Sequence, residues 1–329
     1  MAEREFKTLL VTGGAGFIGS NFIHYMIRKY PEYKIINLDK LTYAGNLKNL
    51  KDIENNENYR FVRGDICDRQ IIEELFSNNK IDAVINFAAE SHVDRSIEDP
   101  GVFIQTDVYG TFVLLEASSK YNAGVFLQIS TDEVYGSIAD GSFKETDSLK
   151  PNSPYAASKA SAEMIVRSFY KTYGTPVLIT RTSNNFGPYQ FPEKIIPLFV
   201  TNLIDGLKVP LYGDGMNVRD WVYVMDNCHA LDLVLHRGEI GQSYNIGGGN
   251  EKPNVWITKT LLKLLEKPQS MIQPVADRLG HDRRYSVDCM KIEQELGWRP
   301  ETDFEEALEK TVKWYLNNEE WWRPLKNRV

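Results

Sequence analysis

The chain has 329 residues, 42% hydrophobic and 25% charged, which is enough to bury a large core in one domain with an appended lobe or in two domains. Its net charge of −7 argues against a nucleic-acid partner, which would need clustered basic residues. No run approaches the ~18 consecutive apolar residues of a membrane span, and the polar N-terminus predicts no signal peptide. Three widely spaced cysteines indicate reduced thiols in a cytoplasmic protein, and no histidine or cysteine spacing predicts a metal site.

The first half of the chain alternates strand-like and helix-like segments. Helical periodicity predicts helices over residues 18–30, 102–121 and 154–173. Continuous apolar strands separated by helices predict the α/β class, with a Rossmann-type, doubly wound parallel sheet covered on both faces. The expected strands are short apolar runs at residues 7–13, 33–39, 59–65, 83–89, 125–131 and 176–182.

The regular alternation of strand-like and helix-like segments ends after about residue 184. Short strands and proline-containing loops mix with helices, and the last expected element is a charged amphipathic helix over residues 304–315. We therefore expect a Rossmann domain over residues 1–184 and a smaller, mixed α/β C-terminal lobe over residues 185–329, with some segments returning to the first domain. The lobe would cover the carboxyl edge of the sheet, where open α/β sheets bind ligands.

A glycine-rich turn joins the first expected strand to the first helix. Gly13, Gly16 and Gly19 are spaced for a tight turn, close approach of backbone N–H groups to a pyrophosphate, and packing of helix on strand. Asp39 ends the second strand, where a carboxylate takes both ribose hydroxyls and repels a 2′-phosphate, so NAD is favoured over NADP. A glycine-rich turn alone also occurs in simple loops. The Asp65–Ile66 pair after the third strand is placed to hold the adenine edge, although its carboxylate equally fits a helix cap.

Tyr155 and Lys159 lie four residues apart near the start of the helix expected over residues 154–173. Residues with this spacing share a helix face. A cation beside a phenol lowers the pKa of the phenol, which would make the tyrosine a usable base near neutral pH. The spacing alone also occurs on solvated helix faces, but after a dinucleotide turn and a fifth strand it indicates a catalytic pair.

These motifs resemble those of the extended short-chain dehydrogenase/reductase superfamily, whose members modify nucleotide sugars. The resemblance includes RDWVYV at residues 219–224 and covers nearly the whole chain. Three segments narrow it to the dTDP-glucose 4,6-dehydratases: DKLTYAGN at residues 39–46, STDEVYG at 130–136 and GHDRRY at 280–285. The resemblance implies NAD as cofactor, a nucleotide-sugar-binding C-terminal lobe, and dehydration of dTDP-glucose to a 4-keto-6-deoxy sugar.

The adjacent Asp132 and Glu133 bear on the reaction type. Related epimerases carry small or hydroxylic residues there, because epimerisation needs only removal and return of hydride at carbon 4. Elimination of water across carbons 5 and 6 needs a base and an acid as well. Neighbours in a strand face opposite sides, so the chain must leave strand geometry by about Asp132, and Gly136 permits a turn. The alternative is an exposed acidic strand end.

The resemblance also implies a role for each catalytic residue. Tyr155, assisted by Lys159 and Thr131, takes the proton of the carbon-4 hydroxyl while hydride passes to NAD. Glu133 then removes the carbon-5 proton, Asp132 protonates the departing carbon-6 hydroxyl, and hydride returns to carbon 6. The cycle is redox-neutral, so NAD should stay bound.

Cofactor and substrate contacts follow from the same resemblance. A guanidinium can hold phosphate bidentately, although Arg219 alone equally fits a surface salt bridge, and Tyr212 offers a stacking face to a base. Leu279 stands where the family has proline. For His92 we expect a structural hydrogen-bonding role, not that of a catalytic acid or a ligand. The expected cofactor contacts are Gly13, Gly16, Phe17, Ile18, Gly19, Asp39, Lys40, Leu41, Thr42, Asp65, Ile66, Phe87, Ala88, Ala89, Ser91, Thr106, Tyr155, Lys159 and Asn185. The expected substrate contacts are Ser91, Thr131, Asn184, Pro210, Tyr212, Arg219, Asn254, Arg278 and His281.

The same residues bear on other functions that this scaffold supports. The acidic pair argues against a 4-epimerase or a UDP-sugar decarboxylase. A GDP-mannose-type dehydratase shares the pair but uses NADP, which Asp39 disfavours. A non-catalytic nucleotide sensor need not keep Tyr155 and Lys159. The resemblance further implies a homodimer through a four-helix bundle of residues 102–121 and 154–173, although the same apolar stripes fit a monomer's core.

Overall fold

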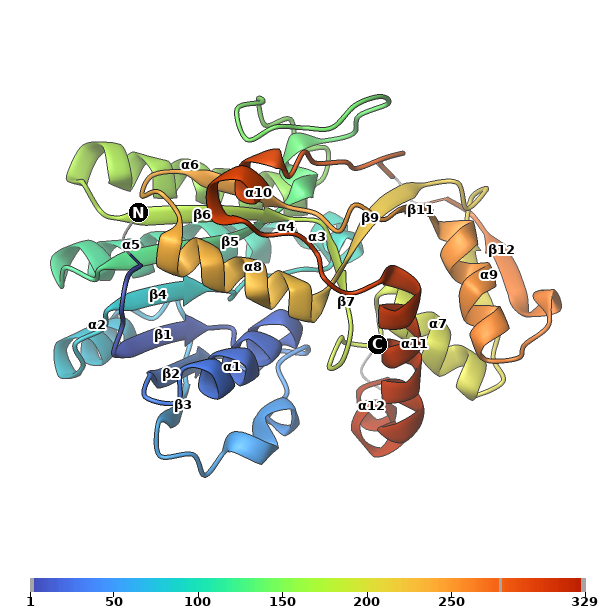
Figure 1. Ribbon diagram of the computed structural model, residues 1–329, viewed down its shortest axis with the longest axis horizontal. Coiled ribbons are helices and arrows are strands. Elements are labelled where there is room, and N and C mark those ends of the chain that lie inside the picture. Colours follow the sequence, from blue (N-terminus) through green and yellow to red (C-terminus); the bar gives the residue numbers. More distant parts are fainter. Residues whose placement is uncertain (1–2, 278–279, 327–329) are drawn as a thin grey trace.

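The computed structural model describes residues 3–277 and 280–326 (Figure 1). Its main sheet has seven parallel strands in the order β10-β6-β5-β4-β1-β2-β3, which confirms the predicted α/β class and Rossmann-type sheet. The strand order reverses between β1 and β4, and open sheets bind ligands at such a point. The strands are β1 (Thr8–Thr12), β2 (Lys34–Asp39), β3 (Tyr59–Arg63), β4 (Ala83–Asn86), β5 (Val125–Thr131), β6 (Val177–Thr182) and β10 (Ser243–Ile246).

Helices cover both faces of this sheet, as the continuous apolar strands predict. In β1, Leu9 and Val11 enter the core on one face and Leu10 enters the core on the other, because successive side chains of a strand point to opposite sides. The first face is covered by α1 (Phe17–Lys29) and α8 (Val224–Arg237). The second face is covered by α2 (Arg69–Asn78), α5 (Thr111–Lys120) and α6 (Pro154–Tyr173).

The helix predicted over residues 102–121 is interrupted. After α3 (Val93–Glu98), α4 (Pro100–Phe103) leads through a π-helical turn, η2 (Ile104–Gly110), into α5. Asp107 in this turn is buried, and its carboxylate accepts hydrogen bonds from Glu90 N (2.9 Å) and Ser158 Oγ (2.6 Å). The π-turn therefore ties the loop after β4 to the helix that carries Tyr155 and Lys159, and such turns are frequent at functional sites.

The C-terminal lobe contains a three-stranded sheet of β7 (Asn184–Phe186), β9 (Val218–Tyr223) and β11 (Glu251–Pro253), and a two-stranded sheet of β8 (Val209–Tyr212) and β12 (Ile272–Val275). In Figure 1 it lies beside the main sheet, on the right. Its aromatic-rich core includes Phe186, Tyr315 and Trp322. The remaining elements are η1 (Leu47–Ile53), η3 (Asp132–Tyr135), α7 (Ile195–Ile204), α9 (Asn254–Leu264), η4 (Gln269–Met271), α10 (Met290–Leu296), α11 (Phe304–Asn317) and α12 (Glu319–Lys326).

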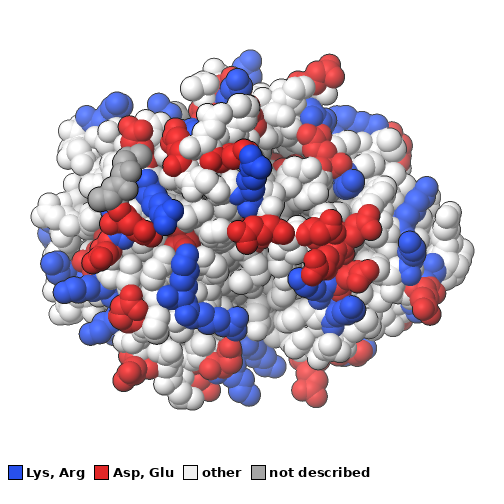
Figure 2. Space-filling model, viewed as in Figure 1, with Lys and Arg blue, Asp and Glu red and all other residues white. Residues whose placement is uncertain are grey.

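Two segments of the second half of the chain return to the main sheet. Strand β10 pairs with β6, and α8 packs against α1. The division at residues 184 and 185 stays a prediction. The helix expected over residues 304–315 is α11, and α12 was not predicted. Within the described ranges, no helix is both long enough and apolar enough to cross a membrane. The face drawn in Figure 2 carries acidic and basic side chains interspersed, with no extended field of one sign.

Candidate active site

A cavity of about 670 Å³ lies at the carboxyl edge of the main sheet. The ends of β1, β2, β4, β5 and β6 and the start of α6 form its floor, and β8, β9 and α9 of the lobe contribute to its wall. All the predicted cofactor, catalytic and substrate residues that the structure describes line this cavity, apart from Leu41. Arg278 and Leu279 lie outside the described residues. Among the described residues, no group of three or more His, Cys, Asp or Glu side chains is arranged to hold a metal ion.

The glycine-rich turn leaves no space for a side chain at Gly13 or Gly19. Gly13 has a φ of +67°, and a Cβ there would lie 2.6 Å from Ala88 N. A Cβ on Gly19 would lie 2.5 Å from Gly13 O, and Gly16 is the N-cap of α1. The turn thus brings bare backbone and the partially positive end of a helix to the cavity, so these residues fit the pyrophosphate of a dinucleotide.

Asp39 is fixed at the end of β2 by backbone groups. Its Oδ2 accepts a hydrogen bond from Ala15 N (2.9 Å), and its Oδ1 accepts one from Leu41 N (2.8 Å). Burial raises the pKa of this carboxyl, while the two N–H donors oppose the rise. Leu41 turns the chain with a φ of +58° and uses its N–H on Asp39. It does not line the cavity, and its contact with the cofactor stays a prediction.

Asp65 lines the cavity after β3, and its role toward the adenine stays a prediction. Its carboxylate pairs with Lys40 Nζ (2.7 Å) and accepts from Cys67 N (2.9 Å). Burial alone would raise the pKa of Asp65, but the bonds to Lys40 and Cys67 outweigh it and hold the pKa below its ordinary value. Helix α2 is capped by Asp68, whose side chain accepts from Gln70 N and Ile71 N. The alternative interpretation of Asp65 as the cap of this helix is therefore wrong.

The acidic pair leaves strand geometry at Asp132, as predicted. Strand β5 ends at Thr131, and Asp132–Tyr135 form the 3-10 turn η3, which Gly136 closes with a φ of +83°. Thr131 Oγ1 accepts from Glu133 N and donates to Asp132 Oδ1, both at 3.2 Å. Both carboxyl groups line the cavity, and Asp132 is only 3% exposed. The alternative of an exposed acidic strand end is therefore wrong.

The two carboxyl groups have different surroundings. Burial, with Glu133 and Asp220 nearby, raises the pKa of Asp132 to about 8 against the opposing charge of Arg219. Asp132 is therefore largely protonated at neutral pH and can donate a proton. Glu133 Oε2 lies 3.5 Å from the hydroxyl of Tyr285, which donates to Asp282 Oδ2 at 2.7 Å.

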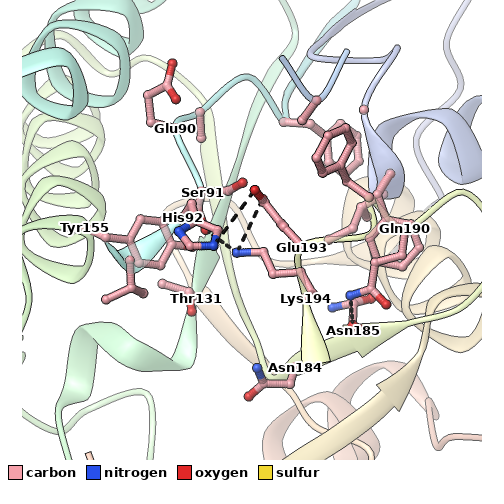
Figure 3. A pocket seen from close by; sticks show the side chains of 18 of the residues that line it. Glu90, Ser91, His92, Thr131, Tyr155, Asn184, Asn185, Gln190, Glu193 and Lys194 are labelled. Carbon is pink, nitrogen blue, oxygen red and sulfur yellow. Dashed lines mark hydrogen bonds and ion pairs between the residues drawn. The ribbon is translucent and has the colours of Figure 1, made fainter. Parts of the chain in front are cut away.

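Tyr155 and Lys159 both line the cavity from one face of α6. The phenol of Tyr155 is hydrogen-bonded to Thr131, and Figure 3 places these two side chains side by side. Lys159 Nζ donates to the carbonyl of Ile129 at 2.8 Å, and burial lowers the pKa of Lys159.

The electrostatics of Tyr155 differ from the prediction. The pKa of Tyr155 is raised well above its ordinary value, first by burial and then by Glu133 and Asp107. The structure does not show the expected lowering of this pKa, because its net direction is upward. The physical reason is that carboxylates surround the phenol while the ammonium is directed to a backbone carbonyl.

The lobe supplies the predicted substrate residues. Arg219 is 6% exposed, donates to the carbonyls of Val218 (2.7 Å) and Asp282 (3.0 Å), and lies 4.2 Å over the Tyr285 ring. Its alternative interpretation as a surface salt-bridge partner is therefore wrong. His281 is 2.6 Å from Asp277 Oδ1. The other members are Asn184 at the start of β7, Pro210 and Tyr212 on β8, and Asn254 at the start of α9.

One cluster in the cavity was missed by the sequence analysis. Glu193 is buried, accepts from Tyr43 Oη (3.0 Å) and lies 3.9 Å from His92 Nε2. Lys194 Nζ donates to the carbonyl of Ser91 at 2.7 Å. Figure 3 shows Glu193 and Lys194 reaching toward His92, opposite Tyr155. No periodicity marks residues 187–194, and only the fold brings this loop over the sheet, so a charged pair beside a proline was the sole available signal.

The geometry defines the class of protein first. A parallel Rossmann-type sheet, a glycine turn at its switch point and a Tyr-x-x-x-Lys pair directed into the cavity above it characterise the extended short-chain dehydrogenase/reductase superfamily.

Comparison with known proteins defines the family. The family model described as GDP-mannose 4,6 dehydratase matches residues 10–311. The dTDP-glucose 4,6-dehydratase of Streptomyces antibioticus is 52% identical over 325 residues, covering 97% of this chain and 96% of the relative. The structure of the Streptomyces venezuelae dTDP-glucose 4,6-dehydratase with NAD and TYD bound has a TM-score of 0.94 and 51% identity, covering 97% and 99% of the two chains.

A third relative agrees with these two. The structure of the Bacillus anthracis dTDP-glucose 4,6-dehydratase in complex with NAD has a TM-score of 0.91 and 52% identity, covering 97% of this chain and 99% of the other. The family model and the relatives differ in the nucleotide of their names but agree on 4,6-dehydration. The near-complete coverage at about half identity decides the narrower assignment. The chain belongs to the dTDP-glucose 4,6-dehydratase family.

Proposed function

We propose that this chain is an NAD-dependent lyase that converts dTDP-glucose into dTDP-4-keto-6-deoxyglucose in nucleotide-sugar biosynthesis. The observation that carries the proposal is the Asp132–Glu133 pair, which lines the same cavity as Tyr155 and Lys159. Removal of the proton from the carbon-4 hydroxyl needs only the tyrosine as base, whereas loss of water needs the acidic pair as well. Relatives of about 50% identity that carry this name support the proposal.

The glycine turn would hold the pyrophosphate of NAD, Asp39 the adenosine ribose, and Asp65 with Ile66 the adenine edge. When bound, NAD would supply the hydride acceptor for carbon 4 and the hydride donor for carbon 6. Thr106, Phe87 and Asn185 complete the wall on this side.

Tyr155 is the base for the carbon-4 hydroxyl. Its hydrogen bond to Thr131 lowers the pKa of the phenol, against the rise that burial and Glu133 cause. The ammonium of Lys159 donates to the carbonyl of Ile129, which holds it in the cavity that also contains the Tyr155 phenol.

The acidic pair carries the elimination. Glu133 accepts the carbon-5 proton, which the neighbouring carbon-4 ketone has made acidic. Asp132, protonated because its pKa is about 8, gives its proton to the departing carbon-6 hydroxyl, so that water leaves and a carbon–carbon double bond forms. The two groups thus divide base and acid between them.

The lobe side of the cavity would hold the nucleoside diphosphate. Arg219 and Asn184 are placed for phosphate oxygens, and Pro210 and Tyr212 for the base.

Incubation of the purified protein with dTDP-glucose, UDP-glucose and GDP-mannose, without added cofactor, tests the proposal. We expect loss of one water from dTDP-glucose, seen by mass and NMR. An isomer of unchanged mass would contradict the proposal. Dehydration of another nucleotide sugar would keep the reaction type but show that the cavity recognises a different base.

A homodimer is part of the same proposal. Val102 on α4, Ile104 on η2 and Met164 on α6 are 44%, 61% and 47% exposed, and they belong to the segments predicted to form a four-helix bundle. Such apolar exposure on adjacent helices favours a partner copy. Sedimentation analysis should give a dimer mass, and a monomer would contradict it.

A cytoplasmic location is proposed from the free thiols of Cys67, Cys228 and Cys289, and cell fractionation tests it.

A further inference from the structure

The glycine-rich turn is held in place by hydrogen bonds to both the backbone N–H and the carbonyl of Ala15. Ala15 donates its N–H to Asp39 Oδ2 (2.9 Å), while its carbonyl accepts from Asn46 N (2.9 Å) and from Asn49 Nδ2 (3.0 Å). Asp39 lines the cavity, and Asn46 is the N-cap of η1. Asn49 lies in η1, is 1% exposed and was not singled out by any sequence motif.

Asn49 connects this turn to the C-terminal end of the described chain. Its Oδ1 accepts a hydrogen bond from Trp321 Nε1 at 2.8 Å, across 272 positions of sequence. Trp321 belongs to α12, beyond the residues 10–311 that the family model matches. The indole packs edge-on against Trp314 and Tyr189, with ring centroids 4.9 and 5.9 Å away, so its position is well determined.

We propose that Trp321 is a positioning residue for the cofactor, acting through Asn49 on the glycine-rich turn. An asparagine amide presents an acceptor on one side and donors on the other. Because the indole N–H occupies Oδ1, the amide has to direct Nδ2 at the carbonyl of Ala15. Without that N–H, the Asn49 side-chain amide can rotate. In the rotated form, Oδ1 faces the carbonyl oxygen of Ala15, and the hydrogen bond between Asn49 and Ala15 is lost.

This inference rests on the proposed binding of NAD. The turn that Ala15 belongs to is the part of the chain expected to approach the pyrophosphate, with Gly13 and Gly16 on either side. A small displacement of this backbone weakens several N–H contacts to a diphosphate together, whereas the nucleotide-sugar side of the cavity lies on other elements.

The test is the substitution Trp321→Phe, which keeps an aromatic ring and removes only the N–H and the second ring. Trp322→Phe is the matched control, because Trp322 is the next residue, is fully buried and donates to the carbonyl of Tyr315 (2.9 Å) instead of Asn49. The dissociation constants of NAD and of dTDP are measured by calorimetry on cofactor-stripped protein, together with the unfolding temperature.

We expect Trp321→Phe to weaken NAD binding about five- to ten-fold, the effect of one lost buried hydrogen bond, and to leave dTDP binding within about two-fold. Trp322→Phe should lower the unfolding temperature comparably and leave NAD binding unchanged. Equal NAD affinity in the two variants, or a parallel loss of dTDP binding in Trp321→Phe, would overturn the inference.

A double-mutant cycle tests whether Trp321 acts through Asn49. In an Asn49→Ala background, Trp321→Phe should cause no further loss of NAD affinity. Additive losses would mean that Trp321 acts by another route and would overturn the inference. A wild-type chain that binds no NAD would instead refute the proposed function, so the two failures are distinguishable.

Discussion

The two ends of the cavity are built differently. The cofactor end draws much of its lining from one stretch of sequence, from Gly13 to Thr42, and the carboxylate at the end of β2, Asp39, is held by two main-chain N–H groups. The sugar end consists of side chains from β5, α6, β9 and the loop around Glu193, which are far apart in the sequence.

The difference lies in how buried charge is compensated. At the cofactor end each oxygen of Asp39 has an N–H partner. At the sugar end Asp132 Oδ2 is buried and has no hydrogen-bond partner among the described residues, and the pKa of this carboxyl rises to about 8. A satisfied carboxylate binds and orients, whereas an uncompensated one becomes a proton donor. The first end is therefore suited to holding a molecule and the second to changing one.

Replacement of Glu133 by glutamine should have the largest effect and should act on the sugar end alone. The amide cannot accept the carbon-5 proton, so kcat for dehydration should fall by about 10³-fold while NAD affinity is retained. Product formation by NMR and NAD binding by calorimetry check both parts. A fully active variant would remove Glu133 from the elimination.

Replacement of Gly13 by alanine should damage the cofactor end instead. The new Cβ would lie 2.6 Å from Ala88 N at a φ of +67°, so NAD affinity should fall by about 100-fold while dTDP affinity is retained. Gly174→Ala is the matched control, because Gly174 has a φ of +71° but has no atom within 4 Å of its Cβ position among the described residues. The prediction fails if the two variants bind NAD equally.

Replacement of Asp39 by asparagine should change cofactor choice by a smaller factor. The amide keeps one acceptor for the backbone N–H groups and removes the charge that repels a 2′-phosphate. We expect the preference for NAD over NADP to narrow by about ten-fold, measured as the ratio of the two dissociation constants. An unchanged ratio would show that other groups set this preference.

The smallest expected effect is on stability, through Asp132. Its pKa is 3.8 ordinarily and about 8 when folded, so between these values the folded protein keeps a proton that the unfolded chain has lost. Wild-type stability should therefore fall as pH rises through this window, and Asp132→Asn removes that dependence. Scanning calorimetry should find the variant equal to wild type near pH 4 and more stable by a few degrees at pH 8. A constant difference across this range would contradict the raised pKa.

The local sequence by itself determined the strands of the first half of the chain, helices α1 and α6, and much of the cofactor end of the cavity. The glycine spacing, Asp39 at the end of a strand and the four-residue interval from Tyr155 to Lys159 are signals between near neighbours, and near neighbours are positioned by one turn or one helix. The departure from strand geometry at Asp132 was predictable for the same reason, with Gly136 as the signal for a turn.

Only the tertiary structure decided which distant groups share the cavity and what charge they carry. The pKa of Asp132 is raised by burial and, besides its neighbour Glu133, by the distant Asp220, and the pKa of Tyr155 is raised by burial, Glu133 and Asp107. The placement of Glu193 over the sheet and the bond from Trp321 to Asn49 likewise join segments far apart in the sequence. Desolvation and long-range contacts depend on the whole packed core, and no local pattern records them.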